Sequence, residues 1–308
     1  YDEDKDTEQW RINLRKINLC FSKHILDLQI KDTEVSELQE RLLLDNDKQP
    51  IDLTHKVLVR IFTNNSFKEG GRFYRGWWQN VPKEFRQFIT IDSKKVTEYD
   101  FSQMNPNMIY DRYNHELGSE DAYTRVAGPD HRDVVKQAFN AMFQASTTLN
   151  KKPDDINDID LDAIKMSWKE LKEEILKAHK PIKDYFFKGL GNRLQFEDSC
   201  IAESVMLQFA HSDAPALPIH DSFVMHHGYG DKGGLEEAMR RAYFERFNSS
   251  LSEKRDLVEK VTHDKIRLDD EKKPINNDDG TIEVDDIINA DSEYSQWRDR
   301  DDMWMSRK

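Results

Sequence analysis

Two short apolar segments that lie far apart in the chain each carry an aspartate, and this pair constrains the fold more than any other feature. The first segment is Val96 to Tyr110, VTEYDFSQMNPNMIY, which contains Asp100. The second is Leu217 to Met225, LPIHDSFVM, which has the pattern of a tight hairpin with Asp221 at its tip. A small sheet that holds both segments would bring the two carboxylates together.

The chemistry of paired carboxylates points to a metal site. Mg²⁺ prefers oxygen ligands and shares phosphate oxygens with its substrates. Two such ions, about 3.5 to 4 Å apart, make a hydroxyl a better nucleophile and hold a triphosphate. We therefore expect two Mg²⁺ ions at Asp100 and Asp221, with Mn²⁺ able to substitute. Either aspartate alone would be weak evidence, because many acids at strand ends only cap the next helix.

Composition describes a globular chain without a membrane segment. Its 308 residues, 34% charged and 37% hydrophobic, suit one catalytic unit with lobes. No apolar run approaches the roughly 20 residues that span a bilayer, and no signal pattern opens the chain, so we expect a cytoplasmic protein. Cys20 and Cys200 lack metal-ligand spacing and are expected to be buried thiols. The chain opens at Tyr1 rather than methionine, so we expect a preceding segment.

The net charge of −13 argues against a nucleic-acid partner until its distribution is considered. Lys56 to Lys95 holds nine Lys or Arg against three acids, just before Asp100. The compensating acid lies in Asp154 to Glu174, with eight acids against three bases, and in Ser249 to Lys308, with seventeen against eleven. A basic strip on an acidic body is what a nucleic-acid groove needs.

The segment Phe67 to Arg86 is rich in arginine, glycine and aromatic residues. Paired glycines allow a close approach of the backbone to a ligand, and the flat side chains between cations suit a sugar-phosphate backbone. The residues concerned are Gly70, Gly71, Arg72, Tyr74, Arg75, Trp77 and Trp78. An aromatic-rich turn packed on the core, with its arginines in solvent, explains the same composition equally well.

A helix is expected over Asp130 to Leu149. Arg132 and Lys136 stand four residues apart and share one of its faces, where they would grip a triphosphate. Lys136 would also protonate the leaving pyrophosphate. The opposite face, with Phe139 and Phe143, reads as a core stripe.

Other elements follow from periodicity and from breakers. We expect helices over Thr7 to Ile30, Thr33 to Leu44, Asn107 to Leu117 after a break at Asn105-Pro106, Arg193 to His211 and Leu235 to Phe247, a strand over Val96 to Phe101, and an acidic surface insertion over Asp154 to Glu174.

Six motifs occur in one order along residues 70–247: Gly71-Arg72, Gln79-Asn80-Val81-Pro82, Arg86-Gln87-Phe88-Ile89, Asp100-Phe101-Ser102-Gln103, Arg132 with Lys136, and His220-Asp221. This order resembles that of family A DNA polymerases, which include bacterial DNA polymerase I and, more distantly, the single-subunit phage RNA polymerases. The resemblance suggests a compact form, without a 5′ nuclease segment or a proofreading exonuclease domain upstream.

The resemblance implies roles for individual residues. Asp100 and Asp221 would bind the metal ions, with the Phe101 carbonyl as an extra ligand, and Arg132 and Lys136 would bind the incoming triphosphate. Primer-template contacts would come from Arg72, Arg75, Gln79, Asn80, Gln195 in the minor-groove-sensing helix, and His220 at the primer terminus. Asn105, Phe139 and Phe143 are assigned to the nucleotide site.

Three departures from the family pattern bear on these roles. Asn105 stands where family DNA polymerases usually have a glutamate that screens out ribose, so the choice of sugar is open. Ser222 replaces the second acid of their His-Asp-Glu motif and resembles the phage RNA polymerases. Phe139 and Phe143 fall one position short of the usual aromatic spacing, and the expected Tyr-Gly is absent.

The expected architecture is α+β: a right-hand polymerase with a small antiparallel palm sheet, helical fingers and a reduced helical thumb. Its parts are residues 1–55 (helical, thumb-like), 56–110 (palm with the primer-template motif and Asp100), 111–192 (fingers-like), 193–248 (palm with the Asp221 hairpin) and 249–308 (acidic extension).

The expected activity is template-directed nucleotidyl transfer from a nucleoside triphosphate to a primer 3′ hydroxyl, most simply by a DNA-dependent DNA polymerase. Its partners would be a DNA primer-template and nucleoside triphosphates, with no membrane. Accessory replication proteins are not specified by the sequence. The alternatives are an RNA polymerase, a primase-like enzyme or terminal transferase, a two-metal nuclease, and a non-catalytic nucleic-acid-binding relic of a polymerase.

Overall fold

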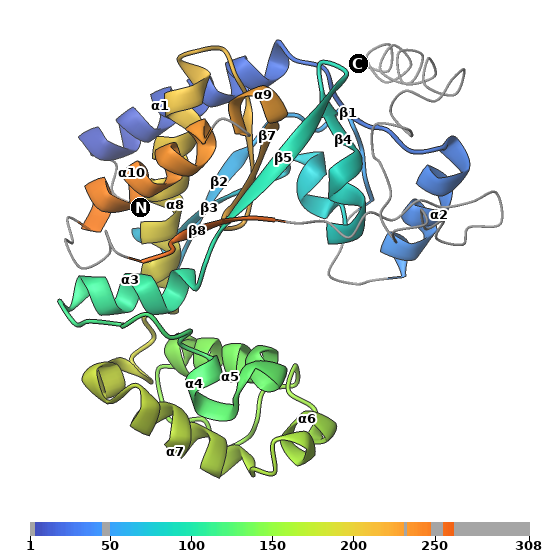
Figure 1. Ribbon diagram of the computed structural model, residues 1–308. Coiled ribbons are helices and arrows are strands. Elements are labelled where there is room, and N and C mark those ends of the chain that lie inside the picture. Colours follow the sequence, from blue (N-terminus) through green and yellow to red (C-terminus); the bar gives the residue numbers. More distant parts are fainter. Residues whose placement is uncertain (1–3, 45–49, 231–232, 248–254, 262–308) are drawn as a thin grey trace.

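The computed structural model describes residues 4–44, 50–230, 233–247 and 255–261. Figure 1 shows a twisted sheet with α1, α8 and α10 along one side and a separate helical lobe below it. The chain passes from the sheet into the lobe after β5 and α3, and it returns to the sheet through α8.

The central sheet is antiparallel throughout. Its strands follow the order β1 (Leu26–Leu28), β4 (Ile89–Ile91), β5 (Lys94–Phe101), β7 (Ser222–His226) and β6 (Ala216–Ile219). A further strand, β8 (Val258–Lys260), pairs with the last three residues of β5. The strand β5 therefore has β7 along one edge, and β4 and β8 in succession along the other.

A second, two-stranded sheet forms from β2 (Val59–Thr63) and β3 (Ser66–Tyr74). Strand β3 packs on α8 (Gly191–Ala210), which contacts α1 (Lys5–Ser22) and α10 (Gly234–Phe247). The sheet–helix approach is close at Gly71, where a Cβ atom would lie 2.9 Å from Ser199 Oγ. Gly71 also has a φ of +82°, which favours glycine.

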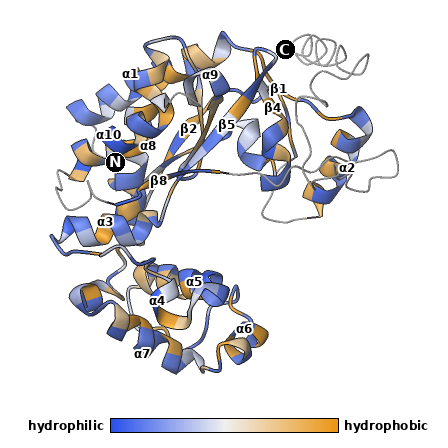
Figure 2. Cartoon of the chain, viewed as in Figure 1, coloured by the Kyte–Doolittle hydropathy of each residue, from blue (hydrophilic) through white to orange (hydrophobic). Residues whose placement is uncertain are grey.

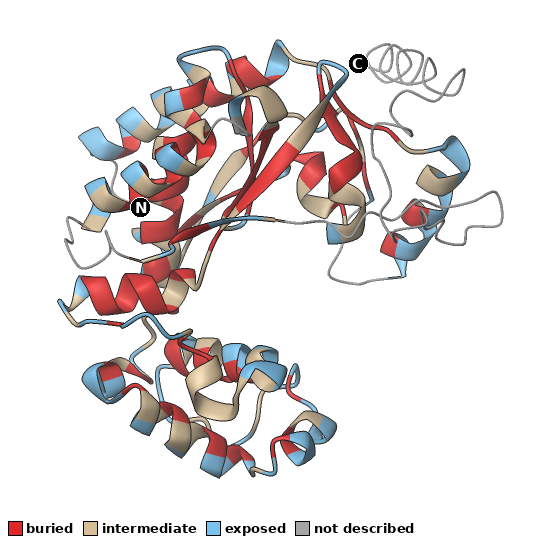
Figure 3. Cartoon of the chain, in the orientation of Figure 1, coloured by how far each residue is buried: buried red, intermediate tan, exposed pale blue. Residues whose placement is uncertain are grey.

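Short helices complete the sheet region. They are α2 (Asp32–Leu43), α3 (Met104–Arg112), α9 (His227–Gly230) and the 3₁₀ turns Trp77–Asn80 and Lys83–Phe88. The strands β6 and β7 are almost completely buried, and so is one side of α8 (Figure 3). The hairpin that leads to Asp221 is therefore held from both faces of the sheet.

The helical lobe consists of α4 (Thr124–Ala127), α5 (Arg132–Gln144), α6 (Asp158–Ala163) and α7 (Trp168–Ala178), with 3₁₀ turns at Pro129–His131 and Lys180–Tyr185. Hydrophilic and hydrophobic residues alternate around these helices (Figure 2), as expected of amphipathic helices around a shared core. Phe139 and Phe143 lie in this core against Phe186, with ring centroids 5.2 and 4.2 Å away.

Several expected elements differ in the structure. The helix expected over Thr7 to Ile30 ends at Ser22, because the backbone N–H of Ile25 donates to the Asp92 side chain at 2.9 Å and the chain continues into β1. The prediction that Asn105-Pro106 interrupts the chain before the helix is wrong. Pro106 lies in the first turn of α3, where a helix does not need its N–H group.

Two expectations about surface segments also change. Trp77 and Trp78 are buried, and Trp78 Nε1 donates to the Pro218 carbonyl at 3.0 Å, so these rings are core residues. Part of the expected acidic extension, residues 255–261, belongs to the fold because it forms β8; residues 248–254 and 262–308 lie outside the described residues. Across the described ranges, no helix combines the length and apolar character needed to cross a bilayer.

Candidate active site

The pairing of β5 with β7 brings Asp100 and Asp221 together. Asp100 lies opposite Ser222, the residue that follows Asp221. The backbone N–H of Phe101 donates to the Asp221 carbonyl at 3.3 Å. His220 turns the hairpin with a φ of 58°. The two aspartates therefore lie at one end of the sheet, as the sequence predicts.

Asp100 is half-buried in an acidic environment. Burial, followed by the negative charges of Asp221 and Glu98, raises the pKa of its carboxyl to about 7, while Lys136 opposes the shift. Its Oδ1 atom is buried and has no hydrogen-bond partner. The negative charge of Asp221 and the buried Asp100 oxygen, which accepts no hydrogen bond, lie close together. Such a site favours a cation.

Glu98 stands two residues before Asp100 and therefore on the same face of β5. Its Oε1 accepts hydrogen bonds from Arg86 Nη1 at 2.9 Å and from Ser222 Oγ at 2.8 Å. Ser222 is the position at which the resemblance expects a second acid. In the structure this serine is hydrogen-bonded to an acid that comes from the neighbouring strand.

A cavity of about 330 Å³ opens beside these acids. Its walls come from the sheet end, from α5 and from the beginning of α8. The residues that line it are Arg72, Asn105, Lys136, Asn140, Phe143, Gln144, Gly191, Leu194, Gln195, His220 and Asp221. Seven of these were expected at the site from the sequence, and they come from segments spread over most of the described chain.

Arg72 extends from β3 to the cavity, and its guanidinium forms an ion pair with Asp198 of α8. Arg72 Nε donates to Asp198 Oδ2 at 2.7 Å, and the Asp198 side chain is 4% exposed. Burial raises the pKa of Asp198 to about 6, although Arg72 opposes the shift. The ion pair fixes the position of one cation on the cavity wall.

Asn105 and Lys136 line the same cavity from different elements. Asn105 Nδ2 donates to Asn140 Oδ1 at 2.9 Å, which joins α3 to α5. Lys136 is exposed and lies near enough to Asp100 to lower its pKa. The lobe and the sheet thus meet at a polar wall formed by two amides and one ammonium group.

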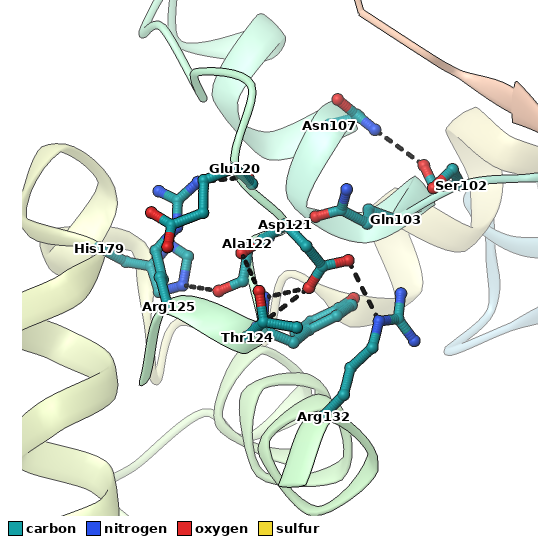
Figure 4. A network of polar contacts seen from close by, with 11 residues as sticks. Ser102, Gln103, Asn107, Glu120, Asp121, Ala122, Thr124, Arg125, Arg132 and His179 are labelled. Atoms are coloured by element: carbon teal, nitrogen blue, oxygen red, sulfur yellow. Dashed lines mark hydrogen bonds and ion pairs between the residues drawn. The ribbon is translucent and has the colours of Figure 1, made fainter. Parts of the chain in front are cut away.

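Arg132 does not line the cavity. Its Nε donates to Asp121 Oδ2 at 3.1 Å, and its guanidinium lies 5.2 Å from the centre of the Tyr123 ring (Figure 4). The Asp121 segment is itself fixed, because the Ala122 N–H donates to Gln103 Oε1 and the Ala122 carbonyl contacts His179 Nε2 at 2.9 Å. In this conformation Arg132 therefore connects α5 to the segment that precedes α4.

Other expected site residues lie away from the cavity wall. Phe139 is fully buried in the lobe core. The Gln79 side chain is held by two backbone groups, because its Nε2 donates to the Phe73 carbonyl at 2.9 Å and to the Pro218 carbonyl of β6 at 3.2 Å. Arg75 is exposed, Asn80 is half-buried and Phe101 is buried. None of these three residues lines the cavity.

Sequence reasoning missed several residues at or near the site, among them Glu98, Asn140, Asp198 and Glu259. Glu259 of β8 lies opposite Asp100 on the other edge of β5 and contributes to its raised pKa. The alternation of β5 could have indicated Glu98, because residues two apart share a face, and the helical spacing of four from Lys136 could have indicated Asn140. The positions of Asp198 and Glu259 depend on contacts between distant segments.

The residues present fit a divalent cation. Asp100 supplies an oxygen atom without a donor, and Asp221 supplies a second carboxylate whose negative charge would be offset by a cation. Both are hard oxygen ligands, the type that Mg²⁺ and Mn²⁺ accept.

Comparison with known proteins gives a distant likeness to solved structures. No protein-family model matches the chain, and no curated protein matches it. Among solved structures, the chain is similar to the POL domain of Pol1 from M. smegmatis in complex with DNA primer-template and dNTP, with 13% identity and a TM-score of 0.42. The match covers 70% of this chain and 48% of that one, so this chain spans about half of the neighbour's length. A likeness this distant assigns neither a family nor an activity to the chain.

Proposed function

We propose that this protein catalyses template-directed nucleotidyl transfer from a nucleoside triphosphate to a primer 3′ hydroxyl. The observation that carries the proposal is the convergence of Asp100 and Asp221, from two paired strands, beside a 330 Å³ cavity lined by Lys136 and Arg72. Paired acids alone would also suit a nuclease. The two cations that line the same cavity favour a substrate that carries several phosphates.

Each residue has a defined part in this proposal. Asp100 and Asp221 would hold divalent metal ions, which when bound promote attack of the 3′ oxygen and neutralise the triphosphate. Lys136 binds the β- and γ-phosphates and gives a proton to the pyrophosphate as it leaves. Arg72, held by Asp198, contacts the primer-template backbone, and His220 and Gln195 face the same nucleic acid.

DNA synthesis is the favoured form of this activity, on the Gln79-Asn80-Val81-Pro82 and Asp100-Phe101-Ser102-Gln103 motifs. Under this proposal the sheet is the palm and the helical lobe is the fingers of a right-hand polymerase of family A type. Arg132 would join the triphosphate only after it leaves Asp121. Asn105, hydrogen-bonded to Asn140, would lie by the sugar, so both sugars belong in the test.

The test is extension of a labelled primer on a DNA template in Mg²⁺, with dNTPs and rNTPs in separate reactions and with an unprimed template. Asp100→Ala and Asp221→Ala are compared with Asp155→Ala, which removes an exposed acid from the lobe. We expect the unmodified protein and Asp155→Ala to extend the primer according to the template. Both site variants should lose at least about a thousandfold of this activity.

The other outcomes separate the alternatives. Shortening of the strand that depends on Asp100 and Asp221 would replace the proposal with a two-metal nuclease. Extension that ignores the template would indicate a terminal transferase. Binding of DNA without any change in strand length would leave a binding protein derived from a polymerase.

A further inference from the structure

We propose that Cys20, His24 and Asp213 form a binding site for a thiophilic divalent cation of the Zn²⁺ type, separate from the carboxylate site. One ligand atom from each residue lies within 4.8 Å of the other two. A thiolate, an imidazole nitrogen and a carboxylate oxygen are the three ligand types that zinc accepts in proteins, usually with a fourth ligand that can be water.

Three separate segments meet at this point. Cys20 lies in the last turn of α1, and His24 follows just after that helix ends. Asp213 lies in the turn between α8 and β6, with a φ of 53°. Asp92, in the turn between β4 and β5, adds a further contact to His24. A cation bound here would join the end of α1 to the turn between α8 and β6, with the turn that carries Asp92 in contact with His24.

The histidine is already oriented as a metal ligand would be. His24 Nδ1 lies 2.6 Å from Asp92 Oδ2, and His24 Nε2 lies 2.9 Å from the Asp213 carbonyl oxygen. Metal-binding histidines commonly donate their second ring N–H to a carboxylate, which fixes the tautomer and the ring orientation. With Asp92 at Nδ1, Nε2 is the nitrogen left for a metal ion, and it lies beside Asp213.

Both ring nitrogens of His24 lie within hydrogen-bond distance of oxygen atoms, so the imidazole is held from two sides. A cation bound at Nε2 would lie near the negative charges of Asp92 and Asp213.

Cys20 is buried beside the other two ligands and supplies the sulfur atom. Zinc binds the thiolate, so binding of Zn²⁺ would release the thiol proton to solvent. Asp213 pairs with Lys23 through Oδ1 at 2.8 Å, and both side chains are about half exposed, so a cation and a water ligand have access from solvent.

The test is a Co²⁺ titration of the whole protein, followed by competition with Zn²⁺. Cobalt bound to a thiolate in a tetrahedral site gives sulfur-to-metal charge-transfer absorption together with visible ligand-field bands. We expect both signals at one equivalent, and we expect Zn²⁺ to remove them. The Asp100→Ala/Asp221→Ala double variant should give the same titration, because the proposed cation site is independent of the proposed polymerase activity.

Three variants assign the ligands. Cys20→Ser should abolish the charge-transfer band, whereas Cys200→Ser, which changes the other free cysteine, should leave it unchanged. Asp213→Asn should weaken Zn²⁺ binding at least about tenfold. This change is at an exposed position, and asparagine tolerates the left-handed backbone there, so it tests the site even if the buried Cys20→Ser variant fails to fold.

The proposal is overturned if the unmodified protein gives no charge-transfer band with excess Co²⁺. A band that persists in folded Cys20→Ser would overturn it as well, as would an unchanged Zn²⁺ affinity in Asp213→Asn. Failure of primer extension would have no bearing on these results, so the two proposals stand or fall separately.

Discussion

The carboxylates around α8 and the carboxylate at the end of β5 differ in what faces them. Around α8, and at Glu98 on β5, each buried acid has an arginine partner: Glu203 with Arg60 at 3.0 Å, Asp198 with Arg72 at 2.7 Å, and Glu98 with Arg86 at 2.9 Å. Asp100 instead has acids as neighbours, and one of its buried oxygens accepts no hydrogen bond.

Burial alone does not explain this difference. Asp198 is 3% exposed and its pKa is raised to about 6, whereas the less buried Asp100 has a pKa of about 7. The arginine beside Asp198 opposes the effect of burial, whereas Asp221 and Glu98 add to it at Asp100. An arginine partner offsets part of the cost of burying an acid, whereas grouped acids leave a negative charge for a ligand to neutralise.

The largest effect should come from Arg60→Ala. Arg60 donates to Glu203, Ser199 and the Gly71 carbonyl, and it is 4% exposed, so its loss leaves a buried carboxylate without its counter-charge. We expect a loss of about 3 to 5 kcal/mol in the free energy of unfolding, measured with urea at pH 7. Arg41→Ala removes an exposed ion pair and should cost less than about 1 kcal/mol. Equal losses in both would contradict the distinction.

Asp198→Asn separates the hydrogen bond to Arg72 from the negative charge. The pKa of Asp198 is raised from 3.8 to about 6, so its ionisation above pH 6 costs stability even though Arg72 opposes the shift. Asparagine keeps an acceptor for Arg72 Nε, so we expect the variant to be about 2 to 3 kcal/mol more stable than the unmodified protein at pH 8. The same urea measurement checks it. A loss of stability at pH 8 would mean that the ion pair outweighs the cost of burying the charge.

Asp100→Asn should have the same sign as Asp198→Asn. The folded-state pKa of about 7 is above the value of 3.8 for an unperturbed aspartate, so ionisation of Asp100 above pH 7 costs stability. The variant should equal the unmodified protein near pH 4, gain stability relative to it between pH 4 and 7, and remain about 4 kcal/mol more stable above pH 7. Urea unfolding in a metal-chelating buffer measures this. A loss at pH 8 would show that Asp100 is a scaffold acid.

Glu259→Gln should have the smallest effect. Glu259 is exposed and is one of several charges that raise the pKa of Asp100. Its neutralisation should lower that pKa by a few tenths of a unit, seen as a shift of the Asp100 carboxyl resonance in an NMR titration. Glu237→Gln, an exposed change on α10, is the matched control and should leave the resonance unmoved.

Sequence patterns indicated the long elements but not the short ones. The helices α2, α5, α8 and α10 follow apolar periodicity, and the hairpin of β6 and β7 follows its alternating pattern. The three-residue strands β1 and β8 carry no such pattern; they are strands because the edges of β4 and β5 supply hydrogen-bond partners. Local sequence does not contain that information.

The candidate site was predictable where a residue follows a strand, and unpredictable where it depends on a loop. Asp100 and Asp221 meet because the strands that carry them pair. The contact of Arg132 with Asp121 depends on the path of the segment between α3 and α4, which has no regular pattern. The grouping of Cys20 with Asp213 requires two segments 193 residues apart to meet, which spacing within one motif cannot indicate.

The position of β8 has a consequence for biosynthesis. The edges of β5 are completed by residues 222–226 and 258–260, which leave the ribosome long after residue 100. A nascent chain that ends before these residues therefore carries Asp100 on an open strand edge, which is a template for pairing with other chains. Glu98, an acid of the same strand, is already present at that stage and disfavours such pairing, so one of the charges that raise the pKa of Asp100 also protects the chain from aggregation during its synthesis.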